Sequence, residues 1–168
     1  MKIIMVGFMG SGKSTISKEL SNILDMKNID MDYEIENETN LKINDIFENY
    51  GEEYFRKLET KMLKEIINND NIIISTGGGI INNTINLEIL KNTQKVIFLD
   101  ANEQTIINNL KNEIKNRPLL KNSTNIEQTI KSLINQRYDK YMYVADKVID
   151  TNQKEIDKII KEIINYIK

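Results

Sequence analysis

Short apolar runs alternate along this chain with longer segments in which apolar side chains recur every three or four positions. The short runs are typical of interior β-strands and are residues 2–6, 27–29, 72–75, 96–99 and 147–149. Helical spacing is found in residues 13–24, a broken stretch 33–68, and residues 85–92, 103–114, 127–144 and 154–167. This order predicts an α/β fold, a three-layer sandwich in which helices cover both faces of a five-stranded parallel sheet.

The length of 168 residues is that of one compact domain, so we expect residues 1–168 to fold as a single unit. No apolar run approaches the ~20 residues of a membrane span, and the first strand-like run begins at residue 2, before any signal peptide could fit. These features predict a soluble, cytoplasmic protein that needs no membrane.

The charge and the missing residue types limit the chemistry. Lys and Arg number 23 against 25 Asp and Glu, so the net charge of −2 offers no general cationic field for nucleic acid. The chain contains neither cysteine nor histidine, which excludes disulfides, thiol nucleophiles and the usual general base. Acid–base chemistry therefore falls to Asp, Glu, Lys or Tyr.

Residues 7–14, GFMGSGKS, match the phosphate-loop pattern GxxxxGK(S/T) between an apolar strand and a helix. In this setting the main-chain N–H groups and the helix dipole hold a polyphosphate, Lys13 reaches the β- and γ-phosphates, and Ser14 is placed to ligate Mg²⁺. The alternative is an ordinary glycine-rich turn. The expected nucleotide contacts are Gly10, Ser11, Gly12, Lys13, Ser14 and Thr15. The motif indicates nucleotide binding without selecting the reaction.

Two aspartates, Asp30 and Asp32, follow the second predicted strand. In extended backbone they point to the same side, at the strand end where ligands of open α/β sheets bind. One carboxylate then serves the metal and the other an acceptor hydroxyl. Equally, both could be polar residues that end a strand, with Asp32 capping the next helix.

Further segments closely resemble the shikimate kinase family, in the family's order and at close to its spacing. They are YEIE at 33–36, IF at 46–47, GEEYFRKLE at 51–59, STGGG at 75–79, RPLL at 117–120, Arg137, Tyr141 and VAD at 144–146. The resemblance runs to about Thr151. The combination of a phosphate loop with DxD, FRxxE, TGGG and RPLL is far more specific than any one of these motifs.

The resemblance implies an adenylate-kinase-like sheet and transfer of the γ-phosphoryl group of ATP, with Mg²⁺, to the 3-hydroxyl of shikimate, giving shikimate 3-phosphate and ADP for aromatic amino acid biosynthesis. It places Asp30 beside Mg²⁺ and Asp32 on the substrate hydroxyls as the candidate base. It also implies a substrate-binding helical segment at about 31–60, a lid at about 111–125 and, as we expect, a monomer.

The same resemblance assigns the remaining site residues. Arg56 and Arg137 would hold the shikimate carboxylate, the backbone of Gly77, Gly78 and Gly79 would line the ring, and Arg117 would reach the phosphates from the lid. These are the only three arginines in the chain. Planar guanidinium groups bind carboxylates in a bidentate manner that lysine cannot reproduce, so the residue types suit these roles.

Each assignment has a plainer alternative. Arg56 and Glu59 are spaced as a surface ion pair on a helix, the three glycines could be a flexible strand exit, and Arg137 could be a solvated helix charge. Phe47 and Phe55 are more typical of core aromatics, and we expect both to be partly buried beside the substrate.

Two departures concern the adenine. The family commonly has an arginine seven positions before the RPLL arginine, where this chain has Leu110 followed by Lys111, and its late loop often contains a proline, which residues 150–154 lack. The adenine contacts therefore stay open. The nearest rival functions are a gluconate or nucleoside-monophosphate kinase and a non-catalytic ATP-binding regulator. Gluconate kinases would be expected to carry a histidine after the phosphate loop, and a regulator to have lost Lys13, Asp32 or Arg117.

Overall fold

The computed structural model describes residues 1–168, apart from the side chain of Lys115. Its strands are β1 (Lys2–Val6), β2 (Lys27–Asp30), β3 (Ile72–Ser75), β4 (Val96–Asp100) and β5 (Lys147–Asp150). Its helices are α1 (Lys13–Leu24), α2 (Met31–Thr39), α3 (Ile43–Ile66), α4 (Thr84–Lys91), α5 (Glu103–Leu110), α6 (Ile126–Val144) and α7 (Ile156–Ile167), with short 3₁₀ turns η1 (Ile80–Asn82) and η2 (Ile114–Asn116). All five predicted strands are present, and three of them end one residue later than predicted.

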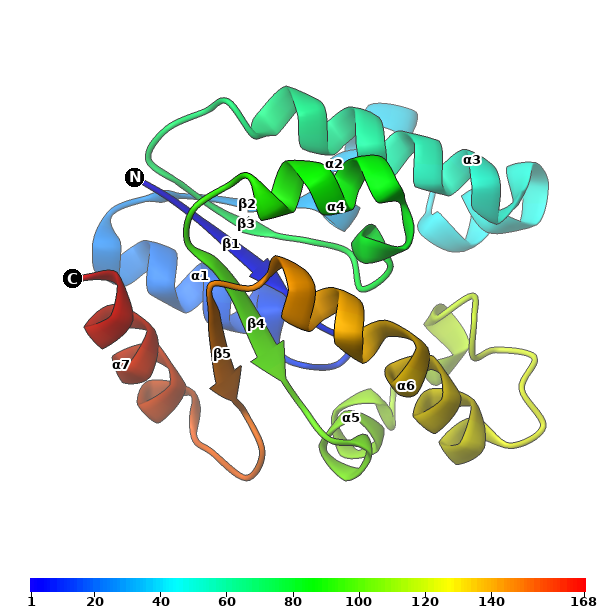
Figure 1. Ribbon diagram of the computed structural model, residues 1–168. Helices are drawn as coiled ribbons and strands as arrows, with labels where there is room; N and C mark the ends of the chain where they lie inside the picture. Colours follow the sequence, from blue (N-terminus) through cyan, green and yellow to red (C-terminus); the bar gives the residue numbers. More distant parts are fainter.

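The five strands form one parallel sheet in the order β2-β3-β1-β4-β5. The central strand β1 pairs with β3 on one side and with β4 on the other, so the carboxyl ends of all strands meet at one edge of the sheet. In Figure 1 this edge faces α5 and the loop before α6, while both chain termini lie at the opposite end. In sheets of this kind ligands bind outside the carboxyl ends of the strands.

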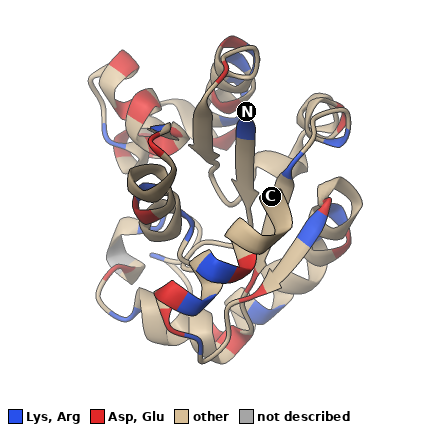
Figure 2. Cartoon of the chain, turned by 90° about the vertical axis from the view of Figure 1, so that its left-hand side faces the viewer, with Lys and Arg blue, Asp and Glu red and all other residues tan. Residues whose placement is uncertain are grey.

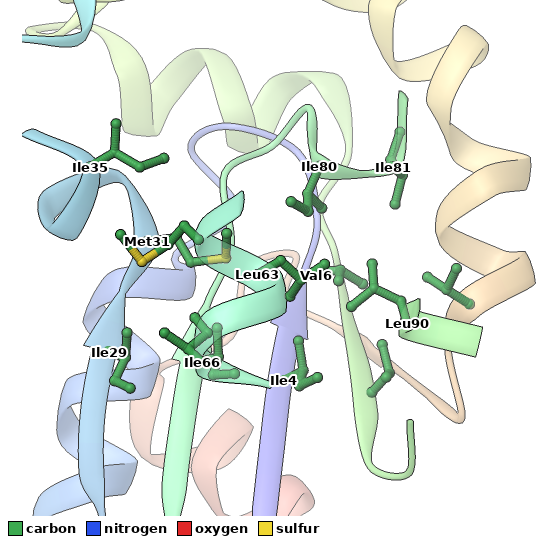
Figure 3. Packing of buried hydrophobic residues seen from close by; sticks show 14 of the residues in the cluster. Ile4, Val6, Ile29, Met31, Ile35, Leu63, Ile66, Ile80, Ile81 and Leu90 are labelled. Atoms are coloured by element: carbon green, nitrogen blue, oxygen red, sulfur yellow. The ribbon is translucent and has the colours of Figure 1, made fainter. Parts of the chain in front are cut away.

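The side chains of each strand alternate between two cores. Ile4 and Val6 join the core covered by α3, α4 and α6, whereas Ile3 and Met5 join the core beneath α1 and α7. All four side chains are fully buried. Figure 3 shows the first core, where residues of α3 and α4 pack on β1 and β2. The two-residue alternation of a strand buried on both faces therefore produces the predicted three layers.

The stretch predicted as one broken helix, residues 33–68, consists of α2 and α3. Gly51 interrupts α3 with φ 81° and ψ 168°, a conformation that side chains rarely adopt, although nothing lies within 4 Å of where its Cβ would be. Four predicted helix ends were wrong by two residues or more, and two of them are the ends of this stretch, which begins at Met31 and stops at Ile66. The fifth helix ends at Leu110 and not at residue 114, because a 3₁₀ turn follows, and the last helix begins at Ile156 and not at residue 154.

Charged residues of both signs are interspersed along the helices seen in Figure 2, in keeping with the balanced composition. None of the helices in the described chain combines the length and the apolar character that a bilayer crossing requires.

Candidate active site

The phosphate loop joins β1 to α1 at the centre of the sheet edge. Gly12 caps α1 with φ 92°, a left-handed conformation that favours glycine. Lys13 is buried, and its Nζ donates hydrogen bonds to the carbonyl oxygens of Gly7 at 2.8 Å and Phe8 at 2.9 Å. Burial lowers the pKa of Lys13 to about 8. The cation is thus held against the loop by main-chain atoms alone, at the place where phosphates would add opposite charge.

Asp30 is the last residue of β2, and its carboxylate accepts hydrogen bonds from the start of α2 and from Ser14. Its Oδ1 accepts hydrogen bonds from the main-chain N–H groups of Asp32 at 3.1 Å and Tyr33 at 3.3 Å, which caps α2. Its Oδ2 accepts a hydrogen bond from Ser14 Oγ at 2.5 Å. The alternative in which Asp32 caps this helix was wrong, because Asp30 is the cap. The extended backbone predicted for the pair is found at Asp30 but not at Asp32, which lies in the first turn of α2.

The partly buried Asp32 and the fully buried Glu59 bring their carboxyl groups to the backbone of Gly77. A Cβ atom on Gly77 would lie 2.9 Å from Asp32 Oδ1 and 2.5 Å from Glu59 Oε1, so any side chain there would displace these carboxyl groups. Neither of these oxygens has a hydrogen-bond partner in the described chain. Burial, and next the charge of Asp30, raise the pKa of Asp32 to about 6. Burial also raises the pKa of Glu59 to about 7, against the lowering effect of the Arg56 guanidinium.

Arg56 is fixed by carboxylates on both sides. Its Nη1 lies 2.5 Å from Glu59 Oε2 and its Nη2 lies 2.9 Å from Glu52 Oε1. The side chain of Arg56 is only 14% exposed and that of Glu59 only 1%, which excludes the plainer interpretation as a surface ion pair. A methyl group on Gly79 would overlap the guanidinium. The glycine loop therefore allows the backbone to approach this largely buried cation.

Arg137, on α6, is buried and not a solvated helix charge. Its Nη1 donates to the carbonyl oxygen of Gly78 at 3.3 Å, and its guanidinium lies 5.5 Å from the centre of the Phe8 ring. The Tyr141 hydroxyl donates to the same carbonyl oxygen. This contact fixes the glycine loop and Arg137 relative to each other, and it was missed by the sequence reasoning because Tyr141 had no assigned role.

Two cavities meet at these residues. The first, about 660 Å³, is lined by Arg56, Glu59, the three glycines and Arg137, and the second, about 690 Å³, by the phosphate loop and the start of α1, Thr15 included. The residues common to both are Met9, Ser14, Asp30, Asp32, Gly78, Glu113 and Arg117. A donor bound in the second cavity would therefore lie against an acceptor in the first, as direct group transfer requires. The first is accordingly named the acceptor cavity and the second the donor cavity.

Arg117 lies in the wall shared by the two cavities. Its Nη2 donates to Glu113 Oε2 at 2.7 Å, and its Nε has no partner in the described chain. Glu113 itself was not among the predicted residues, although its spacing of four before Arg117 is a detectable helix-pair signal. Phe47 and Phe55 also line the acceptor cavity, with ring centres 4.9 Å apart. Phe47 is partly buried as expected, whereas Phe55 is fully buried.

Leu110 explains one departure from the family pattern. It is buried in a third core with Phe8, Ile106 and Leu120, and a Cβ atom on Gly10 would lie 2.9 Å from its Cγ. The leucine is thus part of the floor beneath the phosphate loop. Beyond the loop, the donor cavity is lined by Thr151, Gln153 and Lys154 of the late loop noted in the sequence and by three residues that the sequence did not single out, Thr105, Asn108 and Asn109.

The parallel sheet, the phosphate loop and the adjoining acceptor cavity define a P-loop kinase of the nucleoside-monophosphate-kinase-like fold. The family model for shikimate kinases matches residues 9–168. The chain belongs to the shikimate kinase family, whose members are ATP-dependent kinases.

Individual relatives agree over the whole chain. The shikimate kinase of Sulfurihydrogenibium sp. (strain YO3AOP1) is 42% identical over 166 residues, which cover 99% of this chain and 97% of the relative. That of Clostridium botulinum (strain Alaska E43 / Type E3) is 43% identical over 162 residues, covering 96% and 94%. Among solved structures, shikimate kinase from Acinetobacter baumannii in complex with shikimate superimposes with a TM-score of 0.94 at 36% identity, covering 99% of this chain and 92% of that one.

We predict that Asp32→Asn stabilises the fold at pH 7.5. An acid whose pKa is about 6 in the folded state and 3.8 in the unfolded state binds its proton more tightly when folded. The free energy of unfolding therefore falls by up to about 3 kcal/mol as the pH rises from about 4 to 6. The Asp32→Asn variant does not undergo this loss because its amide does not ionise. Urea unfolding should show a gain of roughly 2 kcal/mol at pH 7.5 that shrinks toward pH 5.

The matched control is Asp139→Asn, which changes an exposed carboxylate on α6 and should alter the unfolding free energy by less than about 0.5 kcal/mol at either pH. A loss of stability in Asp32→Asn at pH 7.5 would show that ionised Asp32 does not destabilise the folded state.

Proposed function

We propose that this chain transfers the γ-phosphoryl group of ATP to the 3-hydroxyl of shikimate. The observation that carries the proposal is the acceptor cavity, where buried Arg137 and Glu59 and the partly buried Arg56 and Asp32 adjoin the donor cavity. Shikimate combines one carboxylate with three ring hydroxyls. It therefore suits a cavity that has cations on one side for the carboxylate and hydrogen-bond acceptors on the other for the hydroxyls. That the A. baumannii shikimate kinase was solved in complex with shikimate supports the same assignment.

The acceptor would be oriented by its carboxylate. Arg56 and Arg137 reach the cavity from α3 and α6, and planar guanidinium groups can grip a carboxylate with paired hydrogen bonds. Glu59 holds Arg56 in place, and the Gly77–Gly79 backbone leaves room for a ring to approach. In this pose the ring hydroxyls face Asp32, in the wall shared with the donor cavity.

Asp32 would receive the proton of the attacking hydroxyl or hold that hydroxyl in line with the phosphate. Its pKa of about 6 leaves it ionised at pH 7.5 while making it more basic than an ordinary carboxylate. Lys13 and Arg117 would neutralise the charge that develops on the transferred group. The more stable Asp32→Asn variant should accordingly have a much lower kcat.

The pair Ser14 and Asp30 fits a magnesium site. It places a hydroxyl and a carboxylate oxygen together at the end of the phosphate loop. The described residues include no cluster of three acidic, histidine or cysteine side chains, which is compatible with Mg²⁺ because this ion usually takes its other ligands from phosphates and water. Ser14 and Asp30 would hold the ion, and its positive charge would offset the negative charge of the polyphosphate.

We further propose that residues 111–125 form a lid over both substrates. This segment supplies Glu113, Arg117 and Leu119 to the cavities, and Lys121 in the same segment forms an ion pair with Glu48 of α3. Enclosure by a lid excludes water from the transferring group. The cytoplasmic location and the monomeric state stay predictions.

Substrate identity is tested by ADP release with each of three acceptors. We expect activity with shikimate, and rates at least about 100-fold lower with gluconate and AMP, because neither has the arrangement of carboxylate and ring hydroxyls that the cavity matches. Activity with only gluconate or only AMP would refute the proposal. ATP binding without turnover of any acceptor would favour the non-catalytic regulator.

Arg137→Lys tests the carboxylate contact. We expect the KM for shikimate to rise on the order of tenfold or more, with the KM for ATP changed by less than about twofold, because lysine cannot form the paired contact. Lys131→Arg, an exposed exchange on the same helix, is the control and should leave both values unchanged. An unaltered KM for shikimate in Arg137→Lys would remove Arg137 from the acceptor site.

Hydrogen exchange tests the lid. Amides of residues 111–125 should exchange several-fold more slowly when ATP and shikimate are bound, since closure orders this segment. The α4 helix, which lines neither cavity, serves as the internal reference. Equal exchange of residues 111–125 with and without ligands would contradict the lid.

A further inference from the structure

Asn152 ties together two segments that flank the far end of the donor cavity. Its Oδ1 accepts a hydrogen bond from the main-chain N–H of Asn102 at 2.7 Å and another from Thr105 Oγ1 at 2.9 Å. Asn102 is the cap of α5 and Thr105 lies in its first turn. One side-chain oxygen thus joins the turn after β5 to the beginning of α5, across 47 to 50 positions of sequence.

The turn that carries Asn152 is itself fixed. Asp150 Oδ1 accepts hydrogen bonds from Asn152 N at 2.9 Å and from Asn152 Nδ2 at 2.6 Å. The preceding Thr151 donates from its main-chain N at 2.9 Å and its Oγ1 at 3.1 Å to the carbonyl oxygen of Asp100. Both the oxygen and the nitrogen of the Asn152 amide are therefore hydrogen-bonded. The contact between Thr151 and Asp100 joins the ends of β5 and β4 next to it.

These two segments both line the donor cavity where it extends past the phosphate loop. Thr105, Asn108 and Asn109 line it from α5, and Thr151 and Gln153 line it from the turn after β5. None of these five residues lines the acceptor cavity. With the phosphates at the loop, the ribose and base of a nucleotide can extend only into this part of the site.

The walls offer the base few strong contacts of their own. No aromatic side chain is among the described residues that line this cavity, so the base has no ring to stack on. Lys154, the cation at this end, is paired with Glu162 at 2.8 Å. The relative position of the two walls then matters for binding of the base, because a preformed site lowers the entropic cost of binding.

We propose that Asn152 is a positioning residue for the nucleobase of the donor, which acts by holding the two walls of this part of the cavity in a fixed relative position. The proposal rests on the proposed function only in taking a nucleoside triphosphate as the donor. Asn152 does not line the cavity, so its effect passes through Thr105, Thr151 and Gln153.

Calorimetric titration of the full chain with two ligands tests the proposal. ADP has a base, whereas inorganic tripolyphosphate reaches the phosphate loop without one. We expect Asn152→Ala to raise the Kd of ADP about tenfold while the Kd of tripolyphosphate changes by less than about twofold. Asn92→Ala is the matched control, since it removes an exposed side-chain hydrogen bond to Glu88 far from both cavities.

Unchanged ADP binding in Asn152→Ala would overturn the proposal, and so would an equal rise of both Kd values, because that would show a general structural role. Should Asn152→Ala fail to fold, Thr105→Val decides. It keeps the side-chain shape, removes one hydrogen bond to Asn152, and should raise the Kd of ADP about threefold with tripolyphosphate unchanged. Because neither titration contains an acceptor, the result does not depend on whether shikimate is the substrate.

Discussion

The acceptor side of the site depends on the buried ion pair between Arg56 and Glu59. Glu59 is completely buried, so without the guanidinium its charge would be very costly, and without Glu59 the Arg56 side chain would have only the partly exposed Glu52 to orient it. The close approach of Gly77 and Gly79 to this pair follows from the same geometry, since any larger residue would displace one of its members. The shape of the acceptor cavity thus depends both on this ion pair and on the lack of side chains at Gly77 and Gly79.

Hydrophobic periodicity was sufficient for the fold. The strands are short, apolar and buried on both faces, a pattern with few alternatives, and each was placed to within a residue. Helix ends were less predictable where local chemistry decides them. Asp30 caps α2 with its side chain, and this moves Asp32 from a strand end into a helix, which no pattern of apolar residues could show.

The candidate site was predictable to different degrees on its two sides. The phosphate loop is contiguous, so its sequence defines it. The acceptor side is assembled from α3, the loop after β3 and α6, and only the family motifs joined these segments. Arg137 shows the difference most clearly, because a single arginine in a polar helix carries no sign that it will be buried against Phe8 and Gly78. Burial of that kind is a tertiary property.

Burial of Arg56 and Arg137 also has a consequence for molecules that compete with the acceptor. For the proposed substrate, a ring that kept its hydroxyls but lost its carboxylate would fill the same space and leave two desolvated cations facing an uncharged group. Sites of this kind discriminate strongly, since the penalty arises from the protein's own unpaired polar groups and not from a poor fit. Competitive inhibitors of this enzyme should therefore retain an anion at that position, even where the rest of the ring is replaced.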